Sequence, residues 1–303
     1  MELRHLELLR ELADRGSVAA VAAATHRTPS AVSQQLRTAQ RQLGVPLTEP
    51  SGRGLRLTEA GAVLAQGGVE VLAALERVQA QWDAFREAPM GRVRLATLPS
   101  AGTFLLAVTQ RRLAATGIEL VLSDYDVAEA DFADLTADND IVIGHSVRGP
   151  RPAGTEGLNV LPLAREPLDV AMAAAHPLAS RSTLTAHDLV EHEWIGVPYG
   201  YPFDTVLAAI ERVTGRDLSV RQRLRDNRLI ESLVASSDLL AILPRFTTPA
   251  DAGLVLREVG DIDTGRHVTA IMRPDRAERR AVRVVLEHLR AVGQAALSGP
   301  ASP

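Results

Sequence analysis

The stretch from residue 28 to residue 43 constrains this chain most, because it reads as a short helix with two chemically different faces. Thr28 can cap the helix through its hydroxyl, and Pro29 suits the first helical position, where no amide hydrogen bond is lost. Apolar residues at three- and four-residue spacing form one stripe: Val32, Leu36, Ala39 and Leu43. The opposite arc carries groups that can bind base edges or phosphates: Ser30, Ser33, Gln34, Arg37 and Arg41. On its own, this arc also fits the solvated face of an ordinary surface helix.

The residues before this helix favour recognition of DNA over the solvated-face alternative. A leucine stripe predicts a helix over residues 2–15, Gly16 ends it, and Ser17 can cap the next. Residues 18–24 are small and apolar, and residues 25–27 form a tight turn. Two helices joined by such a turn, the second with a polar face, are typical of a DNA-binding helix-turn-helix.

A hairpin wing is predicted directly after the two helices. Glycines flank Arg53, and leucines then alternate with Arg56, so the tip of the hairpin can approach phosphates or the minor groove. Residues 1–57 carry eight arginines against five acidic residues, a charge of +3 on a chain whose total is −4. This modest charge predicts that one head binds DNA weakly and that a dimer is needed. The candidate DNA-binding residues are Ser17, Thr28, Ser30, Ser33, Gln34, Arg37, Arg41, Arg53 and Arg56.

In order and spacing, about the first 65 residues resemble the LysR-type transcriptional regulators. The resemblance is carried by Met1–Leu12, Gly16-Ser17, Thr28–Leu36, Leu43–Leu47 and Arg56–Gly61. The family usually has Phe and Arg where this chain has Thr48 and Pro50, so the wing is anchored differently and one expected phosphate contact is missing.

The resemblance implies a bacterial regulator that binds double-stranded operator DNA as a homodimer or homotetramer. It also implies a small-molecule effector in a cleft between two lobes, and RNA polymerase as a partner if the protein activates transcription. The resemblance does not identify the effector, the operator or the direction of regulation.

A long helix is predicted over residues 58–87, with Thr58 as its cap and an apolar stripe along one side. A stripe of this length needs a partner helix, and the residues expected to form a dimer are Leu64, Val71, Leu75, Val78 and Trp82. The alternative is that the stripe packs on its own chain. The pair Gly67-Gly68 allows either a close helix crossing or a bend. Residues 87–91 break the helix and form a hinge.

Beyond the hinge, predicted strands alternate with helices, which indicates an α/β domain of two lobes. The first set has strands at 92–98, 118–123 and 140–144 and helices at 102–115 and 127–137; the second has strands at 168–173, 194–197, 218–224 and 239–243 and helices at 185–191, 204–214 and 228–236. Strand 268–273 and helix 277–297 then return to the first lobe. The resemblance implies a periplasmic-binding-protein-like architecture for this domain.

The predicted fold is therefore α/β overall, with three parts. The first is a winged helix-turn-helix over 1–57, and the second is a linker and dimerisation helix with the hinge over 58–90. The third is a two-lobed effector domain over 91–303, with lobe 1 at 91–163 and 268–303 and lobe 2 at 164–267. The chain is expected to cross between the lobes near 163–167 and 265–269.

Small ligands of two-lobed α/β domains bind between the lobes, at strand ends and helix starts. The candidate effector-binding residues are Pro99, Ser100, Ala101, His145, Ser146, Tyr199, Tyr201, Phe203 and Asn227. Structural alternatives remain open for them. Ser100, Asp204 and Asn227 can simply cap helices, and His145 can be a core residue. The aromatic group can be a turn packed on the lobe, and Arg221, Arg223 and Arg225 fit the solvent face of an edge strand.

Composition excludes several functions. The chain has no cysteine, which removes disulfide switching and thiol catalysis. The acidic residues from Asp124 to Asp140 do not have the spacing of a calcium loop, so no metal or other cofactor is expected. No nucleophile–base pair is recognisable, and an enzyme or a solute-binding module is the rival interpretation, followed by a structural DNA binder without an effector. With no leader or membrane span recognised, a cytoplasmic protein without membrane partners is expected.

Overall fold

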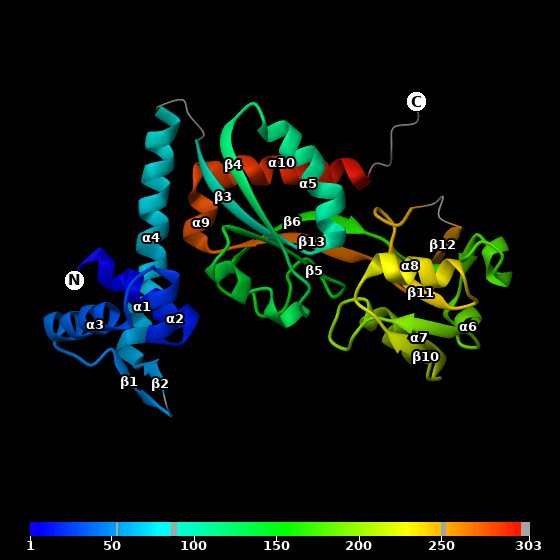
Figure 1. Cartoon of the computed structure of the whole chain (residues 1–303), viewed down its shortest axis with the longest axis horizontal. Helices are drawn as coiled ribbons and strands as arrows, with labels where there is room; N and C mark the ends of the chain where they lie inside the picture. Colours follow the sequence, from blue (N-terminus) through cyan, green and yellow to red (C-terminus); the bar gives the residue numbers. More distant parts are fainter. Residues whose placement is uncertain (53, 86–89, 250–252, 298–303) are drawn as a thin grey trace.

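The computed structural model describes residues 1–52, 54–85, 90–249 and 253–297 (Figure 1). A small helical head and one long helix stand at one end of the molecule, and two α/β lobes follow along its longest axis. Arg53 at the tip of the predicted wing and residues 87–89 of the predicted hinge lie outside the described residues. Within the described part of the chain, no helix is long and apolar enough to cross a membrane.

The head forms the predicted helix-turn-helix with its wing. Its elements are α1 (Leu3–Arg15), α2 (Val18–Ala24), α3 (Pro29–Leu43), β1 (Thr48–Ser51) and β2 (Gly54–Leu57). Gly16 ends α1 in the left-handed conformation at φ 69°, and the Ser17 hydroxyl accepts from the Ala20 amide at 3.1 Å. Thr28 caps α3 in the same way, at 3.2 Å from the Ala31 amide. The apolar stripe of α3 is buried in the core of the head.

The long helix α4 (Glu59–Phe85) leaves the head with Thr58 as its cap, since the Gly61 amide donates to the Thr58 hydroxyl at 3.1 Å. It crosses α1 closely, because a Cβ on Gly68 would lie 3.1 Å from the carbonyl oxygen of Leu6. A Cβ on Gly67 would meet open space. Of the two roles predicted for the glycine pair, the close crossing is confirmed, and it belongs to Gly68.

The apolar residues of α4 divide between two faces. One face packs on the chain's own α1 and α9 (Pro274–Glu278) and buries Ala65, Gly68, Leu72, Ala73 and Ala80. Leu64 is half-buried against the core of the head, and its place in the dimer stripe stays a prediction. Val63 is also exposed, near the head, and five further large residues are exposed along the other face: Val71, Leu75, Val78, Trp82 and Phe85.

Lobe 1 is a five-stranded sheet in the order β4-β3-β5-β13-β6. Its strands are β3 (Met90–Thr97), β4 (Gly117–Asp124), β5 (Ile141–Ser146), β6 (Asn159–Glu166) and β13 (Arg266–Met272). β3 runs parallel to β4 and β5, whereas β13 runs antiparallel to β5 and β6. Helices α5 (Pro99–Leu113) and α10 (Arg280–Leu297) share one core on one face of the sheet. Phe132 packs on the other face.

One predicted helix of lobe 1 is wrong, and another is confirmed except for a break near its start. Residues 127–137 form only the short turns η1 (Glu129–Asp131) and η2 (Asp134–Ala137), because Thr136 and Asn139 side chains bond to nearby carbonyls and compete with a helix. The predicted helix 277–297 is broken at Arg279, which is extended and binds Asp140 and the carbonyl of Arg92. Strand β6 was not predicted.

Lobe 2 is a six-stranded sheet in the order β10-β9-β11-β7-β12-β8. Its elements are β7 (Leu168–Ala173), η3 (Pro177–Ser180), β8 (Thr183–Leu184), α6 (Ala186–Leu189), β9 (Glu193–Gly196), α7 (Asp204–Thr214), β10 (Ser219–Arg223), α8 (Asn227–Ala235), β11 (Leu240–Pro244) and β12 (Leu254–Val259). β12 was not predicted. The chain passes from one sheet to the other at Pro167 and again between β12 and β13, close to the two predicted crossings.

Candidate functional site

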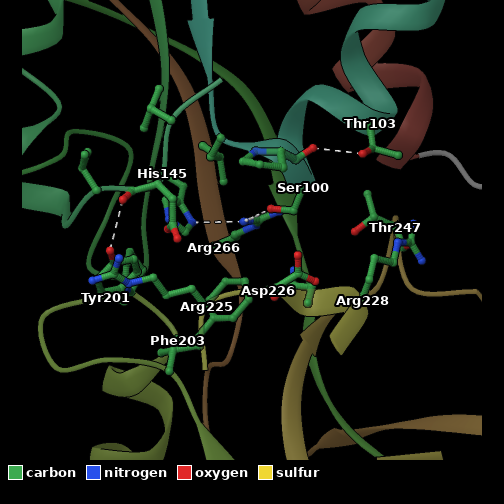
Figure 2. Close-up of a pocket in the computed structure, with 18 of the residues that line it drawn as sticks. Ser100, Thr103, His145, Tyr201, Phe203, Arg225, Asp226, Arg228, Thr247 and Arg266 are labelled. Atoms are coloured by element: carbon green, nitrogen blue, oxygen red, sulfur yellow. Dashed lines mark hydrogen bonds between the residues drawn. The ribbon is translucent and has the colours of Figure 1, made fainter. Parts of the chain in front are cut away.

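A cavity of about 340 Å³ lies between the lobes (Figure 2). Lobe 1 contributes the start of α5, the end of β5 and residues 125–132. Lobe 2 contributes the loop before α7 and the start of α8. The lining side chains with polar or aromatic groups are Ser100, Thr103, Tyr125, Asp126, Phe132, His145, Tyr201, Phe203, Arg225, Asp226, Asn227, Arg228, Glu231, Thr247 and Arg266.

A buried arginine organises the floor of this cavity. Arg266 is fully buried, and its Nε donates to Glu166 at 2.8 Å. Its Nη1 lies 3.0 Å from the Ser100 hydroxyl and 3.1 Å from Nδ1 of His145, and Figure 2 shows the three side chains converging. Glu166 also accepts from the amide of Phe246 in lobe 2 at 2.8 Å. The Glu166–Arg266 pair therefore ties the crossing between the lobes to the cavity wall.

His145 is a neutral hydrogen-bond donor in this arrangement. Burial first, and then the charge of Arg266, hold the pKa of His145 well below its ordinary value. Because Nδ1 accepts from Arg266, the ring proton sits on Nε2. Nε2 makes no hydrogen bond among the described residues, and His145 lines the cavity. The ring thus offers one donor to a ligand.

Three contacts join the lobes across the cavity. The Tyr201 hydroxyl donates to the carbonyl of Asp126 at 3.2 Å (Figure 2). The Phe203 ring lies edge-on to His145, with ring centroids 5.8 Å apart. The Phe104 and Phe246 rings form a similar edge contact at 5.5 Å. These contacts hold the two lobes together in the described structure.

One part of the cavity wall presents hydrogen-bond donors, although Asp126, Asp226 and Glu231 also line the cavity. α5 begins at its wall without a side-chain cap, so its first amides have no partner within the helix. Arg225 makes no hydrogen bond or ion pair with the residues that the structure describes, and it lies over the face of Tyr201, at 5.7 Å. By contrast, Arg228 is paired with Glu231 at 2.8 Å, and Asp226 caps α8 through the Leu229 amide.

Six of the nine predicted effector residues line the cavity: Pro99, Ser100, His145, Tyr201, Phe203 and Asn227. The other three do not. Ala101 lies on the buried side of α5, in the core of lobe 1. Ser146 is also fully buried, and its hydroxyl accepts from the Arg148 amide. Tyr199 is 77% exposed and is covered by the Arg223 guanidinium at 3.8 Å.

The structural alternatives are also decided by these contacts. Asp226, not Asn227, caps α8, and Ser100 binds Arg266 rather than capping α5. Asp204 pairs with Arg223, so that arginine is not a solvated edge residue. Sequence reasoning missed Arg266, because a single arginine in a strand gives no sign of burial.

The DNA-binding candidates fall into three groups. Gln34, Arg37 and Arg41 are exposed along α3, and Ser30 and Ser33 lie beside them. Ser17 and Thr28 use their hydroxyls as helix caps. Arg56 forms an ion pair with Glu49 across the wing at 2.7 Å, which offsets its charge.

The departure at Thr48 has a local explanation. The side-chain carbonyl of Gln40 accepts from the Leu47 amide at 2.9 Å and from the Thr48 amide at 3.2 Å. Gln40 on α3 therefore anchors the start of the wing where the LysR-type regulators usually have Phe. Gln35 is likewise occupied, by Arg27 and by the carbonyl of Arg4.

The acidic residues from Asp124 to Asp140 do not form a cluster. Asp140 accepts from the Arg94 amide at 2.8 Å and from Arg279 at 2.7 Å, whereas Asp138 pairs with Arg15 of the head at 2.8 Å. Among the described residues, no group of three or more His, Asp or Glu side chains is placed to hold a metal ion.

Comparison with known proteins gives two family matches. The LysR substrate binding domain matches residues 86–294, and the family described as bacterial regulatory helix-turn-helix protein, lysR family, matches residues 3–62. The chain is 25% identical over 291 residues to the probable RuBisCO transcriptional regulator of Synechocystis sp., covering 92% of this chain and 83% of that protein.

Solved structures show the same fold. A full-length OxyR variant from Pseudomonas aeruginosa superposes with a TM-score of 0.64 at 20% identity, covering 97% of both chains. The regulatory domain of Synechocystis PCC6803 CcmR in complex with 2-PG superposes with a TM-score of 0.59 at 20% identity, covering 68% of this chain and 98% of that one.

Proposed function

Since the chain belongs to the LysR family of transcriptional regulators, we propose that the exposed arc of α3 reads operator DNA under the control of a small anion bound between the lobes. Two features of one chain carry this proposal. On α3, Gln34 and Arg37 are exposed and have no intramolecular partner in the described structure, and the cavity between the lobes presents unpaired donors. We assign it no catalytic role, and we place it in the cytoplasm with the DNA it binds.

Operator binding is proposed to require two heads. The exposed stripe of α4 from Val71 to Phe85 supports a dimer through this helix, since a lone helix cannot bury such a row. We keep 1–57, 58–90 and 91–303 as the proposed domain limits. RNA polymerase is a further proposed partner if the protein activates transcription.

Replacing Arg37 by alanine is expected to weaken binding to a fragment of the chain's own promoter region by about 1–3 kcal/mol, the worth of one base-edge contact. Fluorescence anisotropy at a fixed salt concentration measures this loss of affinity. A scrambled DNA fragment of equal length measures sequence preference. Arg111→Ala is the matched control, because Arg111 is an exposed arginine of α5 remote from the head. Equal affinity and equal sequence preference in the Arg37 variant would reject a reading role for this residue.

The effector is proposed to be a small carboxylate or phosphate. The free amides at the start of α5, the Nε2 proton of His145 and the unpaired Arg225 all donate hydrogen bonds, and acceptor-rich anions match them. The similar CcmR domain is solved with the small molecule 2-PG. The effector-binding residues proposed here are Ser100, His145, Tyr201, Phe203, Arg225, Asn227 and Arg266.

Thermal-shift screening of small carboxylates and phosphates tests the effector proposal. A ligand at about 100 times its Kd stabilises the folded state by about 2.7 kcal/mol, which is readily seen as a higher Tm. Arg225→Gln should abolish the shift, Arg111→Gln should preserve it, and the neutral amide or alcohol analogue of each hit should give none. Stabilisation by neutral analogues alone, or a shift that survives in Arg225→Gln, would contradict an anion site at this place.

A further inference from the structure

The DNA-binding head is docked on lobe 1 of its own chain. In Figure 1, α1 and α4 lie beside α9, which follows β13 of lobe 1. The long helix reaches lobe 1 through Arg77, 3.4 Å from Glu278, and through the carbonyl of Asp83, which accepts from Arg280 at 2.6 Å. Helix α1 meets lobe 1 through a group of charged side chains on the side away from α3.

These charged side chains form a partly buried ion cluster. Arg10 of α1 donates to Asp275 of α9 at 2.9 Å. From the other side, Arg273 of lobe 1 lies 3.1 Å from Asp14 and 3.5 Å from Glu11, both on α1. Arg10 and Arg273 are each less than a tenth exposed. Helix α1 and lobe 1 therefore each supply one buried guanidinium. Each also supplies a carboxylate that pairs with the guanidinium of the other.

Such a cluster specifies orientation more than it adds stability. The cost of removing charges from water is offset only if the paired groups keep one geometry. A head that slid or rotated on lobe 1 would lose these ion pairs. Three polar atoms of the cluster have no hydrogen-bond partner among the described residues: Arg10 Nε, Arg273 Nη2 and Asp275 Oδ1. Burial lowers the pKa of Arg273 and raises the pKa of Asp14, whereas burial of Glu11 is outweighed by the Arg15 hydrogen bond and the charge of Arg273, which lower the pKa of Glu11. The docked state is thus specific in geometry and modest in energy.

Two neighbouring strands run from the cavity to this cluster. β13 begins at Arg266 in the cavity and is followed directly by Arg273. β5 carries His145 at its cavity end, and Asp140 precedes its other end, where it binds Arg276 and Arg279 beside the cluster. The two strands pair antiparallel, from His267 with Ser146 to Ile271 with Val142. Lobe 1 therefore links the cavity floor and the head through one paired unit.

We propose that Arg10, Glu11 and Asp14 of α1 form a docking surface for Arg273 and Asp275 of lobe 1, and that this ionic latch sets the orientation of the DNA-binding head. The head, α4 and lobe 1 then move as one body, and a ligand that closes the lobes moves lobe 2 against that body. Breaking the latch frees the head without removing any DNA-contacting residue.

A distance measurement without DNA or effector tests the latch, so its outcome is independent of the proposed function. The chain has no native cysteine, and Ala19→Cys on α2 with Ala115→Cys beyond α5 provides two exposed positions for nitroxide labels. Labelled full-length chains are mixed with an excess of unlabelled chains, so that the measured pairs lie within one chain. One narrow distance distribution is expected, and it should become about twofold wider with Arg10→Met and Asp275→Asn combined, because the ion pair that fixes α1 on α9 is then absent.

Controls separate the latch from general loss of structure. Glu7→Gln, on the exposed side of the same helix, should leave the distribution narrow. Asp275→Asn alone keeps the shape of the side chain and should give an intermediate width, with an unchanged far-ultraviolet circular dichroism spectrum. A broad distribution in the unsubstituted chain, or a narrow one in the folded Asp275→Asn and double variants, would overturn the proposal.

Discussion

Combining Leu75→Asp with Val78→Asp is expected to lower operator affinity by about 10²–10⁴-fold, the gain that joining two binding modules provides. Leu75 is 47% exposed and Val78 is 63% exposed, so the substitutions cost the single chain little. In a dimer through α4, both carboxylates would be buried in an apolar seam without partners. Each head would then bind alone, with a charge too small for tight binding.

Sedimentation and anisotropy together measure this effect. The substituted protein should sediment as a monomer at concentrations where the unsubstituted protein is a dimer, and its operator binding should weaken in parallel. Gln66→Asp with Ala84→Asp adds the same charge to α4 at exposed positions outside the stripe, and should leave both properties intact. A dimer that survives the stripe substitutions would place the dimer interface elsewhere.

Arg266→Met is expected to lower the free energy of unfolding by about 3–5 kcal/mol, the cost of leaving one member of a buried ion pair without its partner. Glu166 would remain fully buried, with only the Phe246 amide as donor among the described residues. Ser100 and His145 would lose the guanidinium that orients them. Urea denaturation followed by circular dichroism measures the loss.

The double variant Arg266→Met with Glu166→Gln is the matched control for this prediction. It removes both charges and should recover most of the lost stability, because no buried charge is left uncompensated. Arg221→Met, at an exposed ion pair on the edge strand β10, should change stability by less than about 1 kcal/mol. If Arg266→Met and Arg221→Met cost the same, the pair with Glu166 is not an organising element of the cavity.

The sequence predicts the head well because its determinants are local. Gly16, Ser17 and Thr28 act through groups three or four residues away, and the stripe of α3 needs only the period of a helix. The same reasoning predicts the exposed face of α4. It cannot predict the buried face, because Gly68 matters only through the distant Leu6.

The cavity is less predictable because it depends on contacts between distant segments. Arg266 lies more than a hundred residues beyond both Ser100 and His145 in the sequence. The pairing of β5 with β13 brings His145 and Arg266 together. Strands β6 and β12 were missed because the sheets, not the local periodicity, decide their conformation. The helix predicted over 127–137 failed because Thr136 and the nearby Asn139 bond to backbone carbonyls three and four residues before them.

The tight crossing of α1 and α4 at Gly68 also makes the long helix a lever. With 27 residues, α4 is about 40 Å long at the usual rise of a helix. If the head, α4 and lobe 1 tilt together by about 5° about the end of α4 far from the head, the head moves sideways by about 3.5 Å, close to the step from one base pair to the next. Small rearrangements of lobe 1 would therefore shift the position of the head on DNA by about one base pair.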